Sequence, residues 1–385
     1  MTLAHRLRGI PPTIFTEISA LAVRTGAINL GQGFPDQDGP GSVLEAATRA
    51  MRGGANQYPP GRGVPTLQEA VTRHQARTYG LDLDPVSQVV ITSGATEAIA
   101  AAILGMVDPG DEVILFEPYY DSYAAMLHMA GAVRRTVPLR WPDFRPDLDE
   151  IRAAISPRTK AILLNTPHNP TGTVLSRDEL TGIARIAIEH DLIVISDEVY
   201  EHLTYGVEHV PIATLPGMVE RTLTISSLGK SYSLTGWKVG WATGPDDLVG
   251  AVLAAKQWLT FTTASPLQHA AAYALDHEPE WPNRLRSDLM TKRDRLVSGL
   301  NSLGVPTTTP QGTYFAVSDI SGFGHADGDA FARALPESAG VACIPLRGFH
   351  DSDAGDDLVR WAFCKRSDVI ESALDRLAGA DLHAR

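Results

Sequence analysis

KAILLNTPHNPTGTVLSRDELTGIARIAIEHDLIVIS occupies residues 160–196, with an apolar run at each end (160–165 and 192–196) and a helical pattern between them (177–190). Parallel neighbouring strands need a connection of this length, which is usually a helix. Similar apolar runs are QVVIT (88–92), EVILF (112–116) and TLTIS (222–226). Strands this apolar are buried on both faces. The sequence therefore predicts an α/β fold whose mostly parallel central sheet is sandwiched by helices.

The length of 385 residues predicts two domains, because one hydrophobic core usually stops growing at roughly 250–300 residues. The pattern changes after Pro279. A long amphipathic helix, two alternating strands and a final helix are expected at 284–304, 312–320, 357–365 and 368–379. We expect residues 40–283 to form a large domain, and residues 1–39 and 284–385 to form a smaller α+β domain.

Composition limits the classes of partner. The net charge of −12 argues against nucleic acid, which binds basic surfaces. The two cysteines, Cys343 and Cys364, have no metal-binding spacing, so neither a metal site nor a disulfide is expected. No apolar run reaches the ~18 residues of a membrane span, and the first residues lack a signal-peptide pattern. We therefore expect no membrane partner and a cytoplasmic location.

Polar and aromatic residues follow the five apolar runs, at the edge where open α/β sheets bind ligands. The turn after 88–92 leads into a helix, whose first N–H groups and dipole suit a phosphate. The other runs are followed by Tyr119, Tyr120 and Tyr123, by Asn169, by Asp197 and Tyr200, and by Lys230. Each residue alone has an ordinary explanation, such as a cap or core packing. Together they offer what pyridoxal 5′-phosphate (PLP) requires: a phosphate site, an aromatic plate, an amide, a carboxylate and a lysine.

The motifs around these residues resemble a known family. SGATEA (93–98), EPYYDSY (117–123), NTPHNPTG (165–172), SDEVYEHL (196–203) and SSLGKSYSLTGWKVGW (226–241) follow one another in the order found in class I/II aminotransferases of PLP fold type I. The resemblance extends from NLGQGFPD (29–36) to LVRWAFCK (358–365). It is to the kynurenine- and glutamine-transaminase branch, and most of all to actinobacterial N-succinyldiaminopimelate aminotransferases. It implies an aspartate-aminotransferase-like fold with PLP as cofactor.

The resemblance also implies roles for cofactor-binding residues. Lys230 matches the lysine that holds PLP as a Schiff base, and Asp197 the carboxylate at the pyridine nitrogen. Tyr200 and Asn169 match the partners of the phenolic oxygen. Tyr120 matches the aromatic residue stacked on the ring. The phosphate-binding set is Ala95, Thr96, Ser227 and Lys238. Many relatives have arginine in place of Lys238, and a lysine keeps the charge but not the bidentate fork.

Other residues match positions that contact the substrate or the partner subunit. Arg360 matches the arginine that binds the α-carboxylate, and Gly33 a backbone contact near the substrate; Asn169 and Phe15 are also expected to bind the substrate. Phe15 lies where some relatives have tryptophan, which puts a preference for aromatic substrates in doubt. Tyr58 matches a tyrosine donated across a homodimer interface to the partner's phosphate. Lys230, Asp197 and Tyr200 are the expected catalytic residues.

The expected reaction moves an amino group between an amino acid and a 2-oxo acid. N-succinyl-LL-2,6-diaminopimelate with 2-oxoglutarate is one candidate pair; kynurenine, glutamine and methionine transamination and a cysteine-conjugate β-lyase are alternatives. Gly229-Lys230-Ser231 does not make a nucleotide P-loop, because Thr224 stands where that motif needs glycine. Residues 31–36 do not make a dinucleotide-binding motif, because Asp36 replaces its third glycine.

Overall fold

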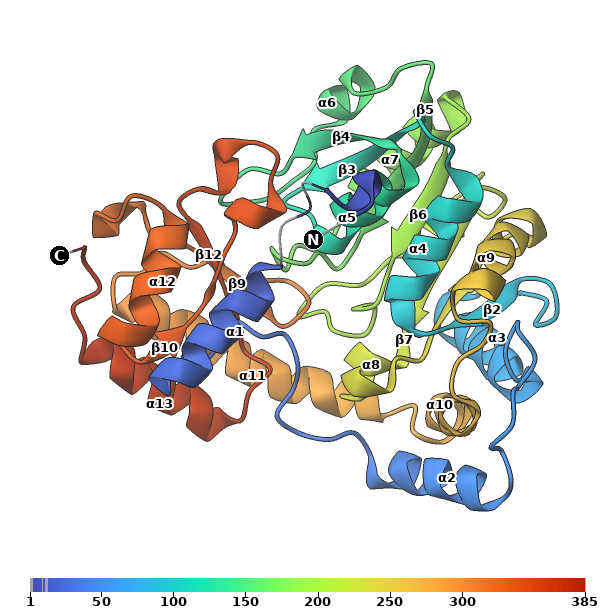
Figure 1. The fold of residues 1–385 in the computed structure, drawn as a ribbon, viewed down its shortest axis with the longest axis horizontal. Coiled ribbons are helices and arrows are strands. Elements are labelled where there is room, and N and C mark those ends of the chain that lie inside the picture. Colours follow the sequence, from blue (N-terminus) through green and yellow to red (C-terminus); the bar gives the residue numbers. More distant parts are fainter. Residues whose placement is uncertain (1–2, 9, 11–12, 385) are drawn as a thin grey trace.

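The computed structural model describes residues 3–8, 10 and 13–384. A seven-stranded sheet lies at its centre, in the strand order β2-β8-β7-β6-β5-β3-β4 (Figure 1). Neighbouring strands are parallel except at β8, which is antiparallel to both β2 and β7. The strands are β2 (Val89–Thr92), β3 (Glu112–Glu117), β4 (Val133–Pro138), β5 (Thr159–Asn165), β6 (Ile193–Asp197), β7 (Thr222–Ser227) and β8 (Gly240–Thr243). The predicted mostly parallel sheet is thus confirmed.

Helices cover both faces of this sheet, because the side chains of each strand alternate between two apolar cores. In β5, Ala161 and Leu163 belong to the core shared with α4 (Gly94–Met106), α5 (Asp121–Ala130) and α9 (Asp246–Leu259). Ile162 and Leu164 belong to the opposite core, which includes α7 (Arg177–Glu189). The remaining helices around the sheet are α2 (Gly41–Arg52), α3 (Pro65–Tyr79), α6 (Leu148–Ala153), α8 (Leu228–Ser231) and α10 (Ser265–His277).

The C-terminal part forms a separate small sheet packed by helices (Figure 1). Strand β12 (Leu358–Ala362) lies between β9 (Phe315–Asp319) and β11 (Ile344–Pro345), antiparallel to both. Helix α11 (Trp281–Ser302) contacts α8 of the large sheet region and the final helix, α13 (Ser367–Ala378). The long helix, the two strands and the final helix that the sequence predicts after Pro279 are all present.

The N-terminal segment contacts both parts of the molecule: the short helix η1 (His5–Leu7) lies against α5 of the large sheet region, and the rest packs against the C-terminal part (Figure 1). Helix α1 (Ile14–Thr25) contacts α12 (Gly328–Ser338), and β1 (Ile28–Asn29) pairs in parallel with β10 (Val341–Ala342). The chain then crosses below the large sheet to α2 (Figure 1). The domain boundaries at residues 39/40 and 283/284 stay a prediction.

Two strands of the large sheet were not expected from the sequence. Strand β4 contains Arg134 and Arg135, and three of its residues are exposed, so it lacks the apolar run of a buried strand. Strand β8 has only four residues and directly follows the segment around Lys238. Within the described residues, no helix is long and apolar enough to cross a membrane.

Candidate active site

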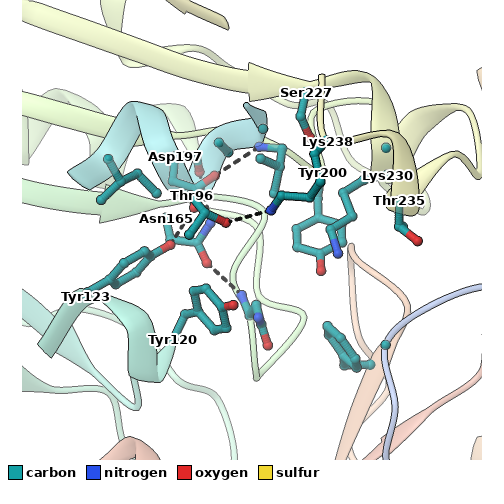
Figure 2. A pocket seen from close by; sticks show the side chains of 18 of the residues that line it. Thr96, Tyr120, Tyr123, Asn165, Asp197, Tyr200, Ser227, Lys230, Thr235 and Lys238 are labelled. Carbon is teal, nitrogen blue, oxygen red and sulfur yellow. Dashed lines mark hydrogen bonds between the residues drawn. The ribbon is translucent and has the colours of Figure 1, made fainter. Parts of the chain in front are cut away.

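A cavity of about 240 Å³ lies at the carboxyl edge of the large sheet, where β5, β6 and β7 end (Figure 2). Both the large sheet region and the C-terminal part contribute to its walls. Of the predicted site residues, the cavity brings together Phe15, Gly33, Ala95, Thr96, Tyr120, Asn169, Asp197, Tyr200, Ser227, Lys230, Lys238 and Arg360. Residues as far apart in sequence as Phe15 and Arg360 therefore meet at one site.

Lys230 extends into the cavity from the short helix α8, directly after β7 (Figure 2). Its amine donates a hydrogen bond of 3.0 Å to the hydroxyl of Tyr314. Burial lowers the pKa of Lys230 to about 8, although the nearby Cys364 and Asp197 oppose the shift. A large fraction of the amine is therefore neutral near pH 8, whereas an exposed lysine would be almost fully protonated.

Asp197 is the last residue of β6 and is buried. Its carboxylate accepts hydrogen bonds from the Tyr123 hydroxyl at 2.6 Å and from the backbone N–H of Val199 at 3.2 Å. Burial raises the pKa of Asp197 to about 6, and the bond from Tyr123 limits the rise. The side chain is thus mostly ionised at neutral pH and has affinity for a cationic group in the cavity.

The start of α4 forms a polar cradle with Lys238 beside these residues. The N-cap Ser93 makes no capping hydrogen bond with its side chain. The amine of Lys238 donates a 3.1 Å bond to the hydroxyl of Thr96, in the first turn of the helix. A Cβ on Gly240 would lie 2.7 Å from the carbonyl carbon of Gly94, so only glycine permits this approach of β8 to the helix start. Helix dipole and ammonium together favour a phosphate here.

Arg360 lines the same cavity from β12 and is almost completely buried. Its guanidinium donates to the side-chain oxygen of Asn169 at 2.8 Å and to the carbonyl of Gly31 at 3.0 Å. Its Nε is buried without a hydrogen-bond partner among the described residues. The ring of Phe315 lies 3.8 Å from the guanidinium carbon. Burial lowers the pKa of Arg360 to about 10, which still leaves it protonated at neutral pH.

The profile of the class I and II aminotransferase family matches residues 25–377, which is most of the chain. The chain is a class I and II aminotransferase. A probable N-succinyldiaminopimelate aminotransferase of Mycobacterium tuberculosis is 50% identical, with 97% of each chain covered. The methionine aminotransferase of Escherichia coli is 40% identical, again over 97% of each chain. Kynurenine–oxoglutarate transaminase 3 of Rattus norvegicus is 39% identical over 96% of this chain and 88% of its own.

Solved structures agree with this family and show the fold. The N-succinyldiaminopimelate aminotransferase of Mycobacterium tuberculosis superposes with a TM-score of 0.96 at 50% identity, covering 98% of this chain and 100% of its own. An aspartate aminotransferase of Thermus thermophilus superposes with a TM-score of 0.92 at 34% identity, covering 98% and 99%. The aminotransferase therefore has the aspartate-aminotransferase-like fold that the sequence predicts, and its cofactor is PLP.

The residues that line the cavity fit the phosphate, the ring nitrogen and the aldehyde of PLP. The cradle at Thr96 and Lys238 can take the phosphate, and the ionised Asp197 can face a protonated ring nitrogen. Lys230 offers an amine with a lowered pKa for the aldehyde. The guanidinium of Arg360, which lines the same cavity, could bind a substrate carboxylate.

The remaining predicted residues have distinct positions. Tyr200 is buried with its ring 5.2 Å from that of Tyr314, and burial raises its pKa well above the usual value. The carbonyl of Gly33 accepts a hydrogen bond of 2.6 Å from Tyr314, and a Cβ on Gly33 would overlap the ring of Phe315. Tyr58 lies outside the cavity and is 85% exposed, so it does not complete the site of its own chain.

Three further residues contact the predicted set: Tyr314 and Asn165 were not expected from the sequence, and Tyr123 was expected only as one of three aromatic residues after a strand. Tyr314 bonds to Lys230, Tyr123 bonds to Asp197, and the side chain of Asn165 links the Asp197 carbonyl to the backbone N–H of Asn169. Tyr123 and Asn165 lie within quoted motifs, and their positions at strand ends could have indicated them. No local pattern connects Tyr314 with a lysine 84 positions away.

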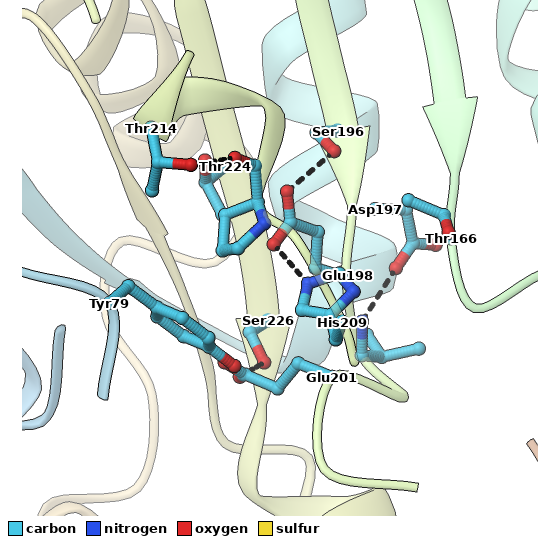
Figure 3. Close-up of polar contacts among 12 residues, drawn as sticks. Tyr79, Thr166, Ser196, Asp197, Glu198, Glu201, His209, Thr214, Thr224 and Ser226 are labelled. Carbon is cyan, nitrogen blue, oxygen red and sulfur yellow. Dashed lines mark hydrogen bonds and ion pairs between the residues drawn. The ribbon is translucent and has the colours of Figure 1, made fainter. Parts of the chain in front are cut away.

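A buried polar cluster surrounds Glu201, on the segment that follows β6 (Figure 3). The Glu201 carboxylate accepts hydrogen bonds from the hydroxyls of Tyr79 and Ser226. The donor and acceptor atoms of His74, Glu201 and His202 lie within 4.8 Å of one another, a spacing that could hold a metal ion. No local sequence motif indicates this group, because His74, on α3, is far in sequence from Glu201 and His202.

Proposed function

We propose that this aminotransferase moves the amino group of an amino acid to a 2-oxo acid by means of Lys230, Asp197 and Arg360. The observation that supports these roles is that three charged groups, from three different segments, meet in one cavity of about 240 Å³. PLP, when bound, withdraws the electron pair left at the substrate α-carbon. Everything else in the reaction depends on binding, orientation and proton transfer by the residues of this chain.

Lys230 acts as the base that removes the α-proton and returns it on the cofactor side. A general base works best with a pKa near the working pH, and burial lowers the pKa of Lys230 to about 8. Asp197 keeps the pyridine nitrogen protonated, because a buried carboxylate stabilises a neighbouring cation. Tyr200 and Asn169 bind the phenolic oxygen from the wall next to Lys230.

Arg360 binds the substrate α-carboxylate with two parallel N–H donors. Its side chain is already held by Asn169, Gly31 and the ring of Phe315, so little conformational freedom is lost on binding. When Arg360 holds the carboxylate, the orientation of the α-carbon is set as well. Its C–H bond then faces Lys230, so removal of the α-proton is favoured over breakage of another bond.

For the substrate, we infer N-succinyl-LL-2,6-diaminopimelate with 2-oxoglutarate as the acceptor. The inference is supported by the 50% identity to the mycobacterial relative named for that substrate. A second cavity shares Phe15 and Tyr120 with the first and contains Arg134, Arg333 and Arg347, which offers room and cations for a long acidic substrate. Each of these arginines is paired with a carboxylate, so a distal substrate carboxylate would have to exchange with an ion pair.

Methionine and kynurenine are the competing substrates, because relatives named for them are 40% and 39% identical. Glutamine and a β-lyase reaction on cysteine conjugates use the same three charged groups. A panel of these amino donors against 2-oxoglutarate and pyruvate separates the candidates by kcat/KM. Highest kcat/KM with the succinylated donor supports the inference; highest kcat/KM with methionine or kynurenine contradicts it. Ammonia release without any 2-oxo acid would instead identify a lyase.

We also propose a homodimer in which Tyr58 reaches the phosphate of the partner's cofactor. Tyr58 and Trp258 are 85% and 83% exposed, and Phe261, against the Tyr58 ring, is 48% exposed. Large exposed aromatic side chains grouped in this way are typical of subunit interfaces.

The free thiols of Cys343 and Cys364 are consistent with the cytoplasmic location expected for such an enzyme.

Mixing two inactive variants tests the dimer directly. In a hybrid of Lys230→Ala and Tyr58→Ala subunits, one site carries both changes and the other carries neither. Random mixing would therefore restore about one quarter of the wild-type sites. Recovery of activity on mixing supports the exchange of Tyr58; no recovery, or an active monomer in sedimentation, contradicts it.

A further inference from the structure

A chain of two hydrogen bonds connects Lys230, through Tyr314, to the loop that contains Gly33. The Tyr314 hydroxyl donates to the carbonyl of Gly33 at 2.6 Å. Because its proton is used in that bond, its oxygen accepts from the Lys230 amine at 3.0 Å. The direction of both bonds is therefore fixed: Lys230 is the donor, and Tyr314 is both acceptor and donor.

The surroundings of Tyr314 hold its hydroxyl in place. The residue directly precedes β9, its side chain is buried, and its carbonyl accepts a 2.9 Å bond from the backbone of Phe363. Its ring packs edge-on against Tyr200 at 5.2 Å and against Phe315 at 4.8 Å. A hydroxyl on such a restrained ring can define the position of a flexible lysine side chain.

The amine of Lys230 lies between two aromatic rings. Its nitrogen is 5.6 Å from the ring centres of both Tyr200 and Tyr314. Tyr314 is the side chain to which it makes a hydrogen bond within the described part of the chain. The charged groups that face it more distantly are Asp197, Lys238 and Arg360, together with the thiol of Cys364.

We propose that Tyr314 is a positioning residue for Lys230. Its hydroxyl holds the free amine of Lys230 at one place in the cavity, next to the loop that contains Gly33. The proposal rests on the proposed role of Lys230. When a substrate amine displaces Lys230, the released side chain has four rotatable bonds and must stay within reach of the α-carbon. The Tyr314 oxygen gives the amine one defined place, on the side of the cavity where Gly33 and Arg360 hold the substrate.

Replacing Tyr314 with phenylalanine removes only the hydroxyl, and the effect can be measured without any catalysis. Competitive labelling of the apoenzyme with a trace of isotopic acetic anhydride, followed by mass spectrometry, gives the pH at which Lys230 becomes reactive. An ammonium donates a stronger hydrogen bond than an amine, so the Tyr314 oxygen favours the protonated form. In Tyr314→Phe we expect the labelling midpoint of Lys230 to fall by about one pH unit.

Tyr232→Phe is the matched control. Tyr232 is also buried and also donates its hydroxyl proton to a backbone carbonyl, that of Ala274, but it does not line the cavity. Its removal should leave the labelling midpoint unchanged. If Tyr314→Phe is too unstable to label, Tyr314→Met removes the same hydroxyl. An unchanged or raised midpoint in the Tyr314 variant would overturn the proposal.

Kinetics of the PLP-loaded enzyme distinguish positioning from substrate binding. In Tyr314→Phe we expect kcat to fall by about 10-fold or more, with KM for the amino donor within about twofold of wild type, because Arg360 is untouched. An unchanged kcat together with an unchanged labelling midpoint would contradict the proposal. If Lys230 had no role in transamination, the labelling midpoint would still shift while kcat stayed the same, so failure of the proposed function would be recognisable.

Discussion

The hydroxyl of Tyr123 donates a hydrogen bond of 2.6 Å to the carboxylate of Asp197, and both side chains are buried in the wall of the cavity. Burial alone would push the Asp197 carboxyl toward its neutral form, and the bond from Tyr123 opposes this. Helix α5 therefore helps to set the charge of a residue at the end of β6.

Cofactor binding should depend on the charge of Asp197. Since its pKa in the apoenzyme is raised to about 6, the contribution of Asp197 to PLP affinity should be fully present above that pH and be lost below it. Tyr123→Phe removes the bond that stabilises the carboxylate, so the pKa rises and the midpoint of the affinity loss moves up by about one pH unit. Titration of the apoenzyme with PLP at several pH values measures the midpoint. No movement relative to wild type would contradict this role of Tyr123.

Replacing Lys238, in the cradle at the start of α4, should weaken the binding of PLP only through its phosphate. Lys238→Gln removes the ammonium that bonds to Thr96, so PLP affinity should fall by about 10–100-fold. Pyridoxal, which has no phosphate, should bind the variant and the wild type equally. Equal losses for both ligands would show that Lys238 acts on the ring or on folding instead.

Arg360→Lys keeps a positive charge but loses the bidentate geometry. We expect KM for the amino donor to rise by on the order of 10–100-fold, with a smaller change in kcat. PLP affinity should change little, since Arg360 faces the substrate side of the cavity. Unchanged kinetics in steady-state assays would exclude Arg360 as the carboxylate partner.

Lys230 should destabilise the apoenzyme at neutral pH. Its folded-state pKa of about 8 lies below that of an exposed lysine, so the ammonium is disfavoured in the folded state. Below pH 8 this cost is fully present, and between pH 8 and about 10.5 it declines, because the unfolded chain then binds more protons than the folded one. Lys230→Met should therefore unfold at higher urea at pH 7, with a gain of about 1–3 kcal/mol.

The gain from Lys230→Met should shrink as the pH is raised toward 10. Comparing the variant with wild type at each pH cancels the titration of all other groups. A variant that is less stable than wild type at pH 7, or a gain that grows with pH, would contradict the lowered pKa.

The sequence predicted the parts of this molecule that depend on local patterns. The apolar runs ending at Asn165 and Asp197 became neighbouring parallel strands, because burial on both faces requires such a pattern. Strands β4 and β8 could not be recognised in the same way. Val133, Arg134 and Arg135 of the edge strand β4 are exposed, so no apolar run marks it, and β8 is too short to show a period.

The site was predictable as far as each residue followed a strand or matched a motif. Lys230, Asp197 and Arg360 were found in this manner, and the structure brings them to one cavity. Tyr314 and the His74–Glu201–His202 group were not found, since they depend on contacts between segments far apart in sequence. Such contacts are decided by the packing of the C-terminal part and of α3, which no local pattern specifies.

The proposed role of Lys230 is tested most directly by finding which lysine carries the cofactor. Borohydride reduction of the PLP-loaded enzyme fixes the cofactor to its lysine, and peptide mass spectrometry locates it. We expect one phosphopyridoxyl group, on Lys230, and no covalently fixed group in Lys230→Ala, which still binds PLP noncovalently. Stoichiometric modification of another lysine, such as Lys238, with Lys230 unmodified, would contradict that role.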